Sequence, residues 1–473
     1  MDHSFQIKSE ILEKVPAKFA CHYKIMPVKF EGNTLTIAIE DPLDINTLDD
    51  ISLFLGFKVE SVPASLSDIS EAIKKHYGLG AETIEEIMDS GELDKDLLAQ
   101  KSKTENIDEM AQDASMVKFV NQMLAQAVKD NATDIHIEPY EDEIKIRYRV
   151  DGMLYDVPIP QDMAYFKSTI VSRIKIMSNL DIAERRLPQD GRIKIKAGGQ
   201  EIDLRVSILP TQFGESVDIR ILSGSMFYSL ENLGLAPSDL AILEKLIKKP
   251  HGIIFVTGPT GSGKTTTLYA CLSKINNKDR KIITIEDPIE YQIKGVTQIQ
   301  VHPKIGLSFA AGLRSMLRHD PDIMMVGEVR DFETAEITIR IALTGHLVFS
   351  TLHTNDAAGG VTRLLDMGIE PYLAASSVEC FIAQRLVRII CHDCSGKGCE
   401  SCRFTGYKGR TAIYEFLVMD ENIRDMVLNR ASSDQIKKKA LQSGMHTLRM
   451  DGLEKIKAGL TTLDEVIRVT QQD

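Results

Sequence analysis

The chain has 473 residues, of which 43% are hydrophobic and 26% charged, and its formal net charge is −12. This length exceeds what one hydrophobic core organises, so about three globular domains are expected. The acidic balance argues against a general role on DNA or RNA, which calls for a basic surface. No apolar stretch approaches the length that spans a bilayer, and the first residues lack the pattern of a signal peptide.

The first predicted domain comprises residues 1–78 and has the pattern of a small α/β fold. Thr34–Ile39 is typical of a strand, Asp41-Pro42 predicts a turn, and Leu66–Tyr77 is typical of a helix. Residues 79–112 then contain ten acidic residues against three lysines, without a sustained strand pattern. This composition predicts a solvated, partly helical linker.

The second predicted domain, residues 113–228, opens with a helix and continues with two hairpins. The helix carries an apolar stripe at helical spacing from Met116 to Val128. In each hairpin apolar residues alternate with charged ones, and the turns fall at Asp151-Gly152 and Gly198-Gly199. We therefore expect half-buried antiparallel strands with a charged outer face, and a seam to the next domain at about 225–232.

The third predicted domain, residues 229–473, contains a phosphate-binding loop directly after the β-branched run Ile253–Thr257. The loop fits the pattern Gly-x4-Gly-Lys-Thr and comprises Gly258, Pro259, Thr260, Gly261, Ser262, Gly263, Lys264, Thr265 and Thr266. Its glycines let successive N–H groups turn toward phosphate oxygens, at the positive end of a helix dipole. Lys264 would then reach the β and γ phosphates, and Thr265 would bind Mg²⁺. The loop indicates a nucleoside triphosphate site, and a plain glycine-rich turn is the weaker alternative.

Three further apolar strands are predicted at Ile282–Ile285, Ile323–Val326 and Leu347–Ser350, alternating with helical segments. This rhythm predicts a doubly wound α/β domain with a largely parallel sheet, whose ligand crevice lies at the carboxyl ends of the strands. The polar runs 286–290 and 327–331 follow two of these strands. Carboxylates there would hold Mg²⁺ through water or deprotonate the attacking water. Taken alone, either run would also suit a helix cap or a solvated loop.

Two histidines, His346 and His353, flank the last of these strands. They could sense the γ-phosphate or be ordinary structural residues. The tail 421–473 is predicted to be helical, with a cap at Ser433-Asp434.

Four of the seven cysteines are packed into a short segment, with the pattern Cys391-x2-Cys394-x4-Cys399-x2-Cys402. Two pairs of thiolates suit a tetrahedral site and favour Zn²⁺, in a structural role because all four ligand places are filled. Free thiols or a disulfide pair are the alternatives. This use of cysteine indicates a reducing compartment, which the cytoplasm fits.

In their order along the chain, these motifs resemble those of the ATPases of type II secretion and type IV pilus assembly. The loop at 258–266 resembles the Walker A box of this family. The aspartate, Walker B and histidine boxes of the family resemble segments 285–291, 320–331 and 344–354, in that order. Its N-terminal signatures resemble segments 132–139 and 186–192, and its C-terminal signature resembles segment 406–415. The resemblance is dense over 113–473 and loose over 1–78.

The resemblance implies a RecA-like P-loop NTPase domain with a C-terminal helical and zinc region, a PAS-like α+β domain over 113–228 and a small α/β front domain. It also implies hydrolysis of MgATP. Lys264 and Thr265 would contact phosphates and Mg²⁺, and Glu290 would be the general base. Glu328 would act on the metal through water, since the Walker B run ends in Gly-Glu and not in the usual aspartate.

The family also implies that His346 and His353 report on the nucleotide state. Arginines would complete the site when one domain closes over the nucleotide of another, and the candidates are Arg192, Arg205, Arg314, Arg318 and Arg330. Taken alone, each of these arginines would also suit an ordinary surface position. The implied protein is a cytoplasmic homohexamer that assembles pilin or pseudopilin filaments. It would reach the inner membrane only through platform and adaptor proteins. The sequence does not separate type II secretion from pilus assembly.

Residues 1–78 resemble the adaptor domain of this family at Val15–Ala20 and Asp41-Pro42. Some relatives bind a cyclic dinucleotide through an Arg-Leu-Gly-type motif, which this region lacks, so no such binding by it is expected. A P-loop motor acting on nucleic acid is the alternative function, and the acidic charge disfavours it. A non-catalytic nucleotide-gated scaffold is a further alternative, which Lys264, Glu290 and Glu328 disfavour.

Overall fold

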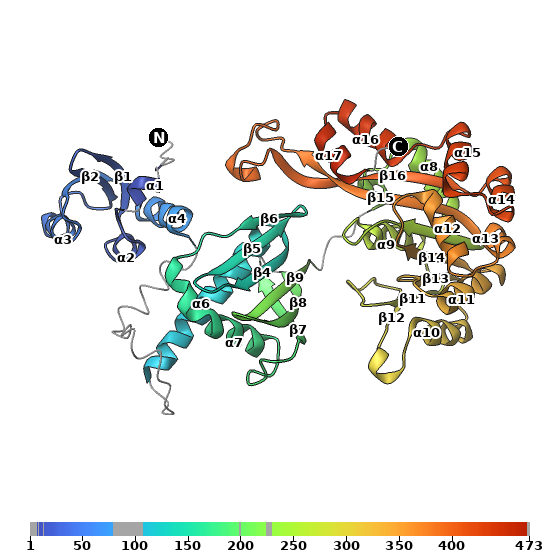
Figure 1. The fold of residues 1–473 in the computed structure, drawn as a ribbon, viewed down its shortest axis with the longest axis horizontal. Coiled ribbons are helices and arrows are strands. Elements are labelled where there is room, and N and C mark those ends of the chain that lie inside the picture. Colours follow the sequence, from blue (N-terminus) through green and yellow to red (C-terminus); the bar gives the residue numbers. More distant parts are fainter. Residues whose placement is uncertain are drawn as a thin grey trace. The chain divides into compact units, whose positions relative to one another are not determined.

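The computed structural model describes residues 7, 9–12, 14–78, 107–197, 200–223 and 229–470. The chain divides into two compact units, Met1–Gly224 and Ser225–Asp473 (Figure 1). Most of the predicted linker 79–112 lies outside the described residues, and its last part, from Ile107, belongs to a helix. The Gly198-Gly199 turn and the first part of the predicted seam also lie outside them.

A small three-stranded sheet with its helices begins the first unit. The strand order is β1-β2-β3, and β2 is antiparallel to β1 and parallel to β3. The predicted strand Thr34–Ile39 and helix Leu66–Tyr77 are confirmed. Its elements are α1 (Ser9–Leu12), α2 (Ala17–His22), β1 (Met26–Glu31), β2 (Thr34–Ile39), α3 (Ile45–Leu55), β3 (Lys58–Pro63) and α4 (Leu66–Tyr77).

A six-stranded antiparallel sheet, in the order β6-β5-β4-β9-β8-β7, completes the first unit. Helices α6 and α7 bury one face of it, with Phe119, Met123 and Ile170 in the core. Both predicted hairpins are confirmed, and Asp151 and Gly152 have positive φ angles, as a type I′ turn requires. The elements are α6 (Ile107–Lys129), β4 (Ala132–Pro139), β5 (Ile144–Val150), β6 (Met153–Asp156), η1 (Gln161–Phe166), α7 (Lys167–Met177), β7 (Gln189–Ala197), β8 (Gln200–Thr211) and β9 (Gly214–Ser223).

A seven-stranded sheet, in the order β12-β11-β13-β14-β10-β15-β16, organises the second unit. Each neighbouring pair is parallel except β15 with β16. The four predicted strands are confirmed as β10, β11, β13 and β14, whereas β12, β15 and β16 were not predicted. The strands are β10 (Gly252–Thr257), β11 (Ile282–Glu286), β12 (Thr297–Gln300), β13 (Ile323–Val326), β14 (Leu347–Leu352), β15 (Val378–Ile390) and β16 (Tyr407–Val418).

Helices cover both faces of this sheet, so its central strands are buried along their whole length. One apolar layer includes residues of α10 to α17, and the other includes residues of η2, α8 and α9. The predicted doubly wound α/β domain is therefore confirmed. The helices are η2 (Leu230–Leu233), α8 (Pro237–Leu246), α9 (Lys264–Ile275), η3 (Pro303–Ile305), α10 (Phe309–Met316), η4 (Leu317–His319), α11 (Phe332–Leu343), α12 (Ala357–Asp366) and α13 (Pro371–Ser377).

The tail is helical, as predicted, but the cap of its second helix precedes the predicted position by one residue. Ser432 accepts from the N–H of Gln435 and forms a capping box with it. None of the described helices combines the length and the apolar character that a membrane span needs. The remaining helices are η5 (Glu400–Cys402), α14 (Glu421–Leu428), α15 (Ser433–Gln442), α16 (Leu448–Lys457) and α17 (Leu463–Val469).

Glu415 on β16 connects two of these helices to the edge of the sheet. Its side chain is buried, and its carboxylate accepts from the N–H of Ala357 at 2.8 Å and from the N–H of Leu448 at 3.4 Å. These are the first residues of α12 and α16, where N–H groups have no partner within their own helix. One carboxylate therefore satisfies two helix ends.

The substitution Glu415→Ala should destabilise the second unit, because it leaves two buried N–H groups without their acceptor. The expected loss is about 2–4 kcal/mol, which for a unit of this size lowers the midpoint of thermal unfolding by at least about 4 °C. Differential scanning calorimetry measures this. The exposed Glu421→Ala is the control, and equal midpoints for the two variants would contradict the double-capping role.

Candidate nucleotide-binding site

The phosphate-binding loop lies between the carboxyl end of β10 and the first turn of α9, which begins at Lys264. Gly258 and Gly263 have φ angles of 147° and 87°, so both adopt conformations that other residues rarely accept. A Cβ atom on Gly258 would lie 2.6 Å from the carbonyl oxygen of Gln384, and one on Gly263 would lie 2.8 Å from the Gln384 amide. Strand β15 therefore packs directly against the loop through Gln384, and only glycine fits at these two positions.

Lys264 points back over this loop. Its Nζ donates to the carbonyl oxygens of Gly258 at 2.8 Å and Pro259 at 3.0 Å. Burial lowers the pKa of Lys264 to about 8, with Glu328 opposing the shift and Arg385 adding to it. A phosphate group would favour the charged form, so the ammonium is suited to an incoming anion.

A buried hydroxyl supports the fit of phosphate to this loop. Ser262 is 3% exposed, and its Oγ has no hydrogen-bond partner among the residues that the structure describes. A buried polar atom without a partner is costly. A phosphate oxygen in the loop would supply the missing acceptor for this hydroxyl, and the backbone N–H groups around it are suited to donate to the same phosphate.

Glu328, His353 and Arg330 meet beside the loop, after β13 and β14. The Glu328 carboxylate lies 2.7 Å from Arg330 Nε and 3.6 Å from His353 Nε2. Burial lowers the pKa of His353, and the Lys264 charge adds to this shift, so its neutral imidazole is favoured. The sequence placed all three at this edge of the sheet, and the structure brings Glu328 and His353 together within range of the Lys264 charge.

Glu290 belongs to the segment that follows β11, and its side chain is partly buried. Strand β11 is a parallel neighbour of β13, so both strands have their carboxyl ends on the same side of the sheet. Glu290 follows β11 and Glu328 follows β13, so both glutamates lie on that side. The predicted base is thus on the correct edge. Its catalytic role stays a prediction.

The structure does not bring all the predicted residues together. His346 precedes β14, and its carbonyl accepts from the N–H of Gly252 at the start of β10. It therefore lies at the opposite edge from the P-loop, roughly 20 Å away along a six-residue strand. The expectation that His346 senses the γ-phosphate bound by its own chain is wrong, because a residue that precedes a parallel strand cannot lie at its carboxyl end.

The predicted arginines are distributed over both units. Arg192 and Arg205 lie opposite each other on β7 and β8. Both belong to the first unit, whereas the P-loop belongs to the second. Arg318 follows α10 and donates to the Arg314 carbonyl and to Ser315 Oγ. Arg314 forms an ion pair with Glu333. No role for these arginines follows from their contacts within one unit.

Gln384 and Arg385 of β15 are residues of this site that the sequence analysis missed. Gln384 Oε1 accepts from Thr267 of α9 at 2.8 Å, and Arg385 donates to the Asn355 carbonyl at 2.8 Å. Both side chains are buried next to the P-loop. The signal that could have found them is a polar pair within the apolar run 381–387.

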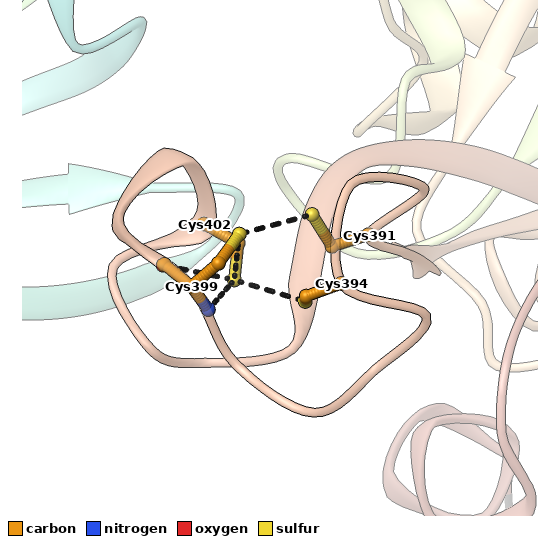
Figure 2. A group of neighbouring side chains, drawn as sticks. All are labelled: Cys391, Cys394, Cys399 and Cys402. Atoms are coloured by element: carbon orange, nitrogen blue, oxygen red, sulfur yellow. Dashed lines mark hydrogen bonds between the residues drawn. The ribbon is translucent and has the colours of Figure 1, made fainter. Parts of the chain in front are cut away.

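The four cysteines close the hairpin of β15 and β16, and their side chains converge (Figure 2). The Sγ–Sγ distances are 3.9 Å for Cys391–Cys399, 3.7 Å for Cys394–Cys402 and 3.7 Å for Cys399–Cys402. A tetrahedral zinc site with Zn–S of about 2.3 Å has S–S edges of about 3.8 Å. The thiols are free, and their spacing fits a metal better than a disulfide.

The backbone around these cysteines is also arranged for a metal. The residue pairs after Cys394 and after Cys402, namely 395–396 and 403–404, have positive φ angles, so the two cysteine turns repeat one geometry. The N–H groups of Gly398 and Cys399 donate to Sγ of Cys394 at 3.2 Å and of Cys402 at 3.1 Å. Such N–H groups stabilise thiolates around a metal. Sulfur ligands in this geometry suit Zn²⁺.

A doubly wound parallel sheet, with a P-loop after β10 and acidic groups after β11 and β13, defines the class of RecA-like P-loop NTPases. Residues 109–468 match the family model described as type II/IV secretion system protein, and residues 2–83 match the MshEN domain. The chain belongs to the type II/IV secretion system protein family and is an ATPase of that family. The predicted resemblance is therefore confirmed.

Similar proteins are named for both branches of this family. The type IV pilus assembly ATPase PilB of Myxococcus xanthus is 45% identical, over 99% of this chain and 88% of the relative. Type II secretion system protein E of Aeromonas hydrophila is 41% identical, over 98% and 97%. The pilus retraction motor PilT with bound ADP is 27% identical, with a TM-score of 0.53 over 74% of this chain and 96% of that chain. The fold of the Legionella pneumophila ATPase DotB is also similar, at 24% identity and a TM-score of 0.58, over 74% and 95%.

The affinity for ATP should fall as the pH rises above about 8. The nucleotide-free Lys264 has a pKa of about 8 and must be protonated to bind phosphate. Below this pH the affinity is constant, and above it the affinity falls by up to about tenfold per pH unit. Isothermal titration with a non-hydrolysable ATP analogue and Mg²⁺, between about pH 7 and pH 9.5, measures this. A constant affinity over that range would show that Lys264 keeps the pKa of an ordinary lysine.

Proposed function

We propose that this ATPase is a homohexameric motor that hydrolyses MgATP to assemble pilin or pseudopilin filaments in a secretion or pilus machine. The observation that carries the proposal is the meeting of Lys264, Glu328 and His353 at the carboxyl edge of the RecA-like sheet. The match of residues 2–83 to a front domain and the four-cysteine module favour filament assembly over retraction, since retraction motors usually lack both.

In the proposed reaction, water attacks the γ-phosphorus, its proton passes to Glu290, and ADP and phosphate leave. Lys264 stabilises the charge that develops on the phosphate oxygens. Mg²⁺, bound through Thr265 and through water on Glu328, would neutralise charge between the β and γ phosphates. His353 lies beside Glu328 and would respond to the charge of the γ-phosphate. The other P-loop residues would contribute their backbone N–H groups, except Pro259, which has none.

Arginines of the first unit would complete the site of a neighbouring subunit. Arg192 and Arg205 are cross-strand partners, and the next residue in the same row is Arg220, which forms an ion pair with Asp134 at 3.0 Å. Like charges directly opposite each other repel, whereas a row of guanidinium groups suits a multiply charged anion. This charge pattern supports a role of Arg192 and Arg205 in closing over a bound triphosphate, with Arg318 as a further candidate on the second unit.

The proposed partners follow from the family. The motor would work in the cytoplasm at the inner membrane, and it would touch the membrane only through platform and adaptor proteins. Residues 1–78 are the proposed adaptor domain. The names of the relatives do not separate type II secretion from pilus assembly, because both occur above 40% identity.

Removal of the P-loop lysine and of the base should have different effects. Lys264→Ala should abolish nucleotide binding, and Glu290→Gln should retain bound ATP while kcat falls by at least about 100-fold. Nucleotide titration and a steady-state phosphate-release assay measure these effects. The exposed Lys278→Ala is the control for the lysine. A parental kcat in Glu290→Gln would exclude Glu290 as the base, and stimulation by added DNA or RNA would favour a nucleic-acid motor.

The four cysteines should bind about one zinc ion per chain. Cys394→Ser should lose this zinc, because three thiolates hold the ion more weakly, and elemental analysis of the purified protein measures the content. His392→Ala is the matched control, since His392 is exposed in the same loop. Loss of zinc in the His392 variant, or equal zinc in all variants, would contradict the four-cysteine site.

A further inference from the structure

A polar cluster with two buried members lies beside the segment that carries Glu290. It consists of Tyr269 on α9, Glu286 at the end of β11 and Gln298 on β12, and we refer to it as the Glu286 cluster. Glu286 is 3% exposed and Tyr269 is 1% exposed. None of the three residues belongs to the catalytic set assigned above, so their burial beside that set needs its own explanation.

The Glu286 carboxylate is fully engaged by donors. Its Oε1 accepts from Thr284 Oγ1 at 2.6 Å and from Gln298 Nε2 at 3.1 Å, and its Oε2 accepts from the Tyr269 hydroxyl. Burial raises the pKa of Glu286, and these hydrogen bonds oppose the shift. A buried acid that is held by three donors has one fixed orientation. An apolar residue would fill the same space without fixing a direction.

Gln298 connects this carboxylate to the chain that follows Glu290. Its Nε2 also donates to the Tyr291 carbonyl at 3.1 Å, and its Oε1 accepts from the N–H of Ile293 at 2.8 Å. One side chain therefore holds two backbone groups of the segment between β11 and β12. The segment is attached at its start through Glu286 and again just after Glu290.

Tyr269 connects the same segment to the phosphate-binding helix. It lies on α9, which begins with Lys264, and its ring packs edge-on against Tyr291 with the centroids 4.6 Å apart. The backbone of Glu290 is also close enough to the Tyr269 hydroxyl to oppose the rise in its pKa that burial causes. The helix that binds the phosphates and the segment that carries the base thus share one buried side chain.

We propose that Tyr269, Glu286 and Gln298 are positioning residues that fix Glu290 relative to the phosphates bound by Lys264. The inference rests on the proposed function, in which Glu290 accepts the proton of the attacking water. A general base acts only within hydrogen-bond reach of that water, and a displacement of about 1 Å can reduce a rate about 100-fold. The cluster should therefore affect turnover and not the affinity for nucleotide, because among the described residues its side-chain hydrogen bonds do not involve the P-loop.

Two substitutions test this role in the full-length protein. Tyr269→Phe keeps the ring and removes the hydroxyl, and Gln298→Ala releases the backbone at Tyr291 and Ile293. Each should lower kcat at least about tenfold, while the Kd for a non-hydrolysable ATP analogue stays within about twofold of the parent. The matched controls are Tyr372→Phe and Thr297→Ala, which change exposed residues and should keep the parental kcat.

The same experiment separates a failure of this inference from a failure of the proposed function. If Glu290→Gln loses turnover but both cluster variants keep it, the positioning role is wrong and the proposed base stands. If Glu290→Gln keeps turnover, the proposed base is wrong and the inference falls with it. If both cluster variants bind the ATP analogue more weakly and also lose kcat and thermal stability, the cluster has a general structural role. This result would also overturn the inference. Tyr269→Phe is the stricter test of this point, because it leaves the packing of the ring unchanged.

Discussion

The second unit depends on one constraint. A parallel sheet that helices cover on both faces can bind a charged ligand only where its strands end. Its central strands are buried along their whole length. Polar side chains and free helix N–H groups therefore gather where the strands end. The P-loop, the Glu290 segment, Glu328 and His353 all follow from this rule. The same rule excludes His346, which stands before its strand.

The polar groups that do enter the interior serve to connect elements that are distant in sequence. Glu286 joins α9, β11 and β12, Glu415 joins β16 to the starts of α12 and α16, and Gln384 joins β15 to α9. Each of these side chains is buried and hydrogen-bonded, so none carries the full cost of an unpaired polar group. Their hydrogen bonds fix the orientation of the elements they join, which apolar packing alone would not specify. The interior thus sets where the reactive groups at the edge can lie.

The sequence predicted the elements that local pattern determines. The position of the loop between β10 and α9, four sheet strands, both hairpins and the convergence of the four cysteines were predicted correctly, because periodicity and motif spacing specify them directly. Strand β12 is short and mostly polar, and β15 contains the pair Gln384-Arg385, so neither has the sequence pattern of a buried strand. Their place is set by pairing with strands far away in the chain. The Glu286 cluster was missed for the same reason, since its members lie on three separate elements.

The hairpin of β15 and β16 has a consequence for how this molecule can be studied. Strand β15 pairs with β10 only as far as Ala383, and beyond this residue its pairing with β16 continues to Ile390. The cysteine loop is therefore carried past the sheet on a two-stranded ribbon, roughly 20 Å along the strand from Arg385. Residues inserted between the two cysteine pairs would lengthen only the tip of that ribbon and would leave the register of every sheet strand unchanged. This tip is a natural place for a spectroscopic label that reports on the nucleotide edge without touching it.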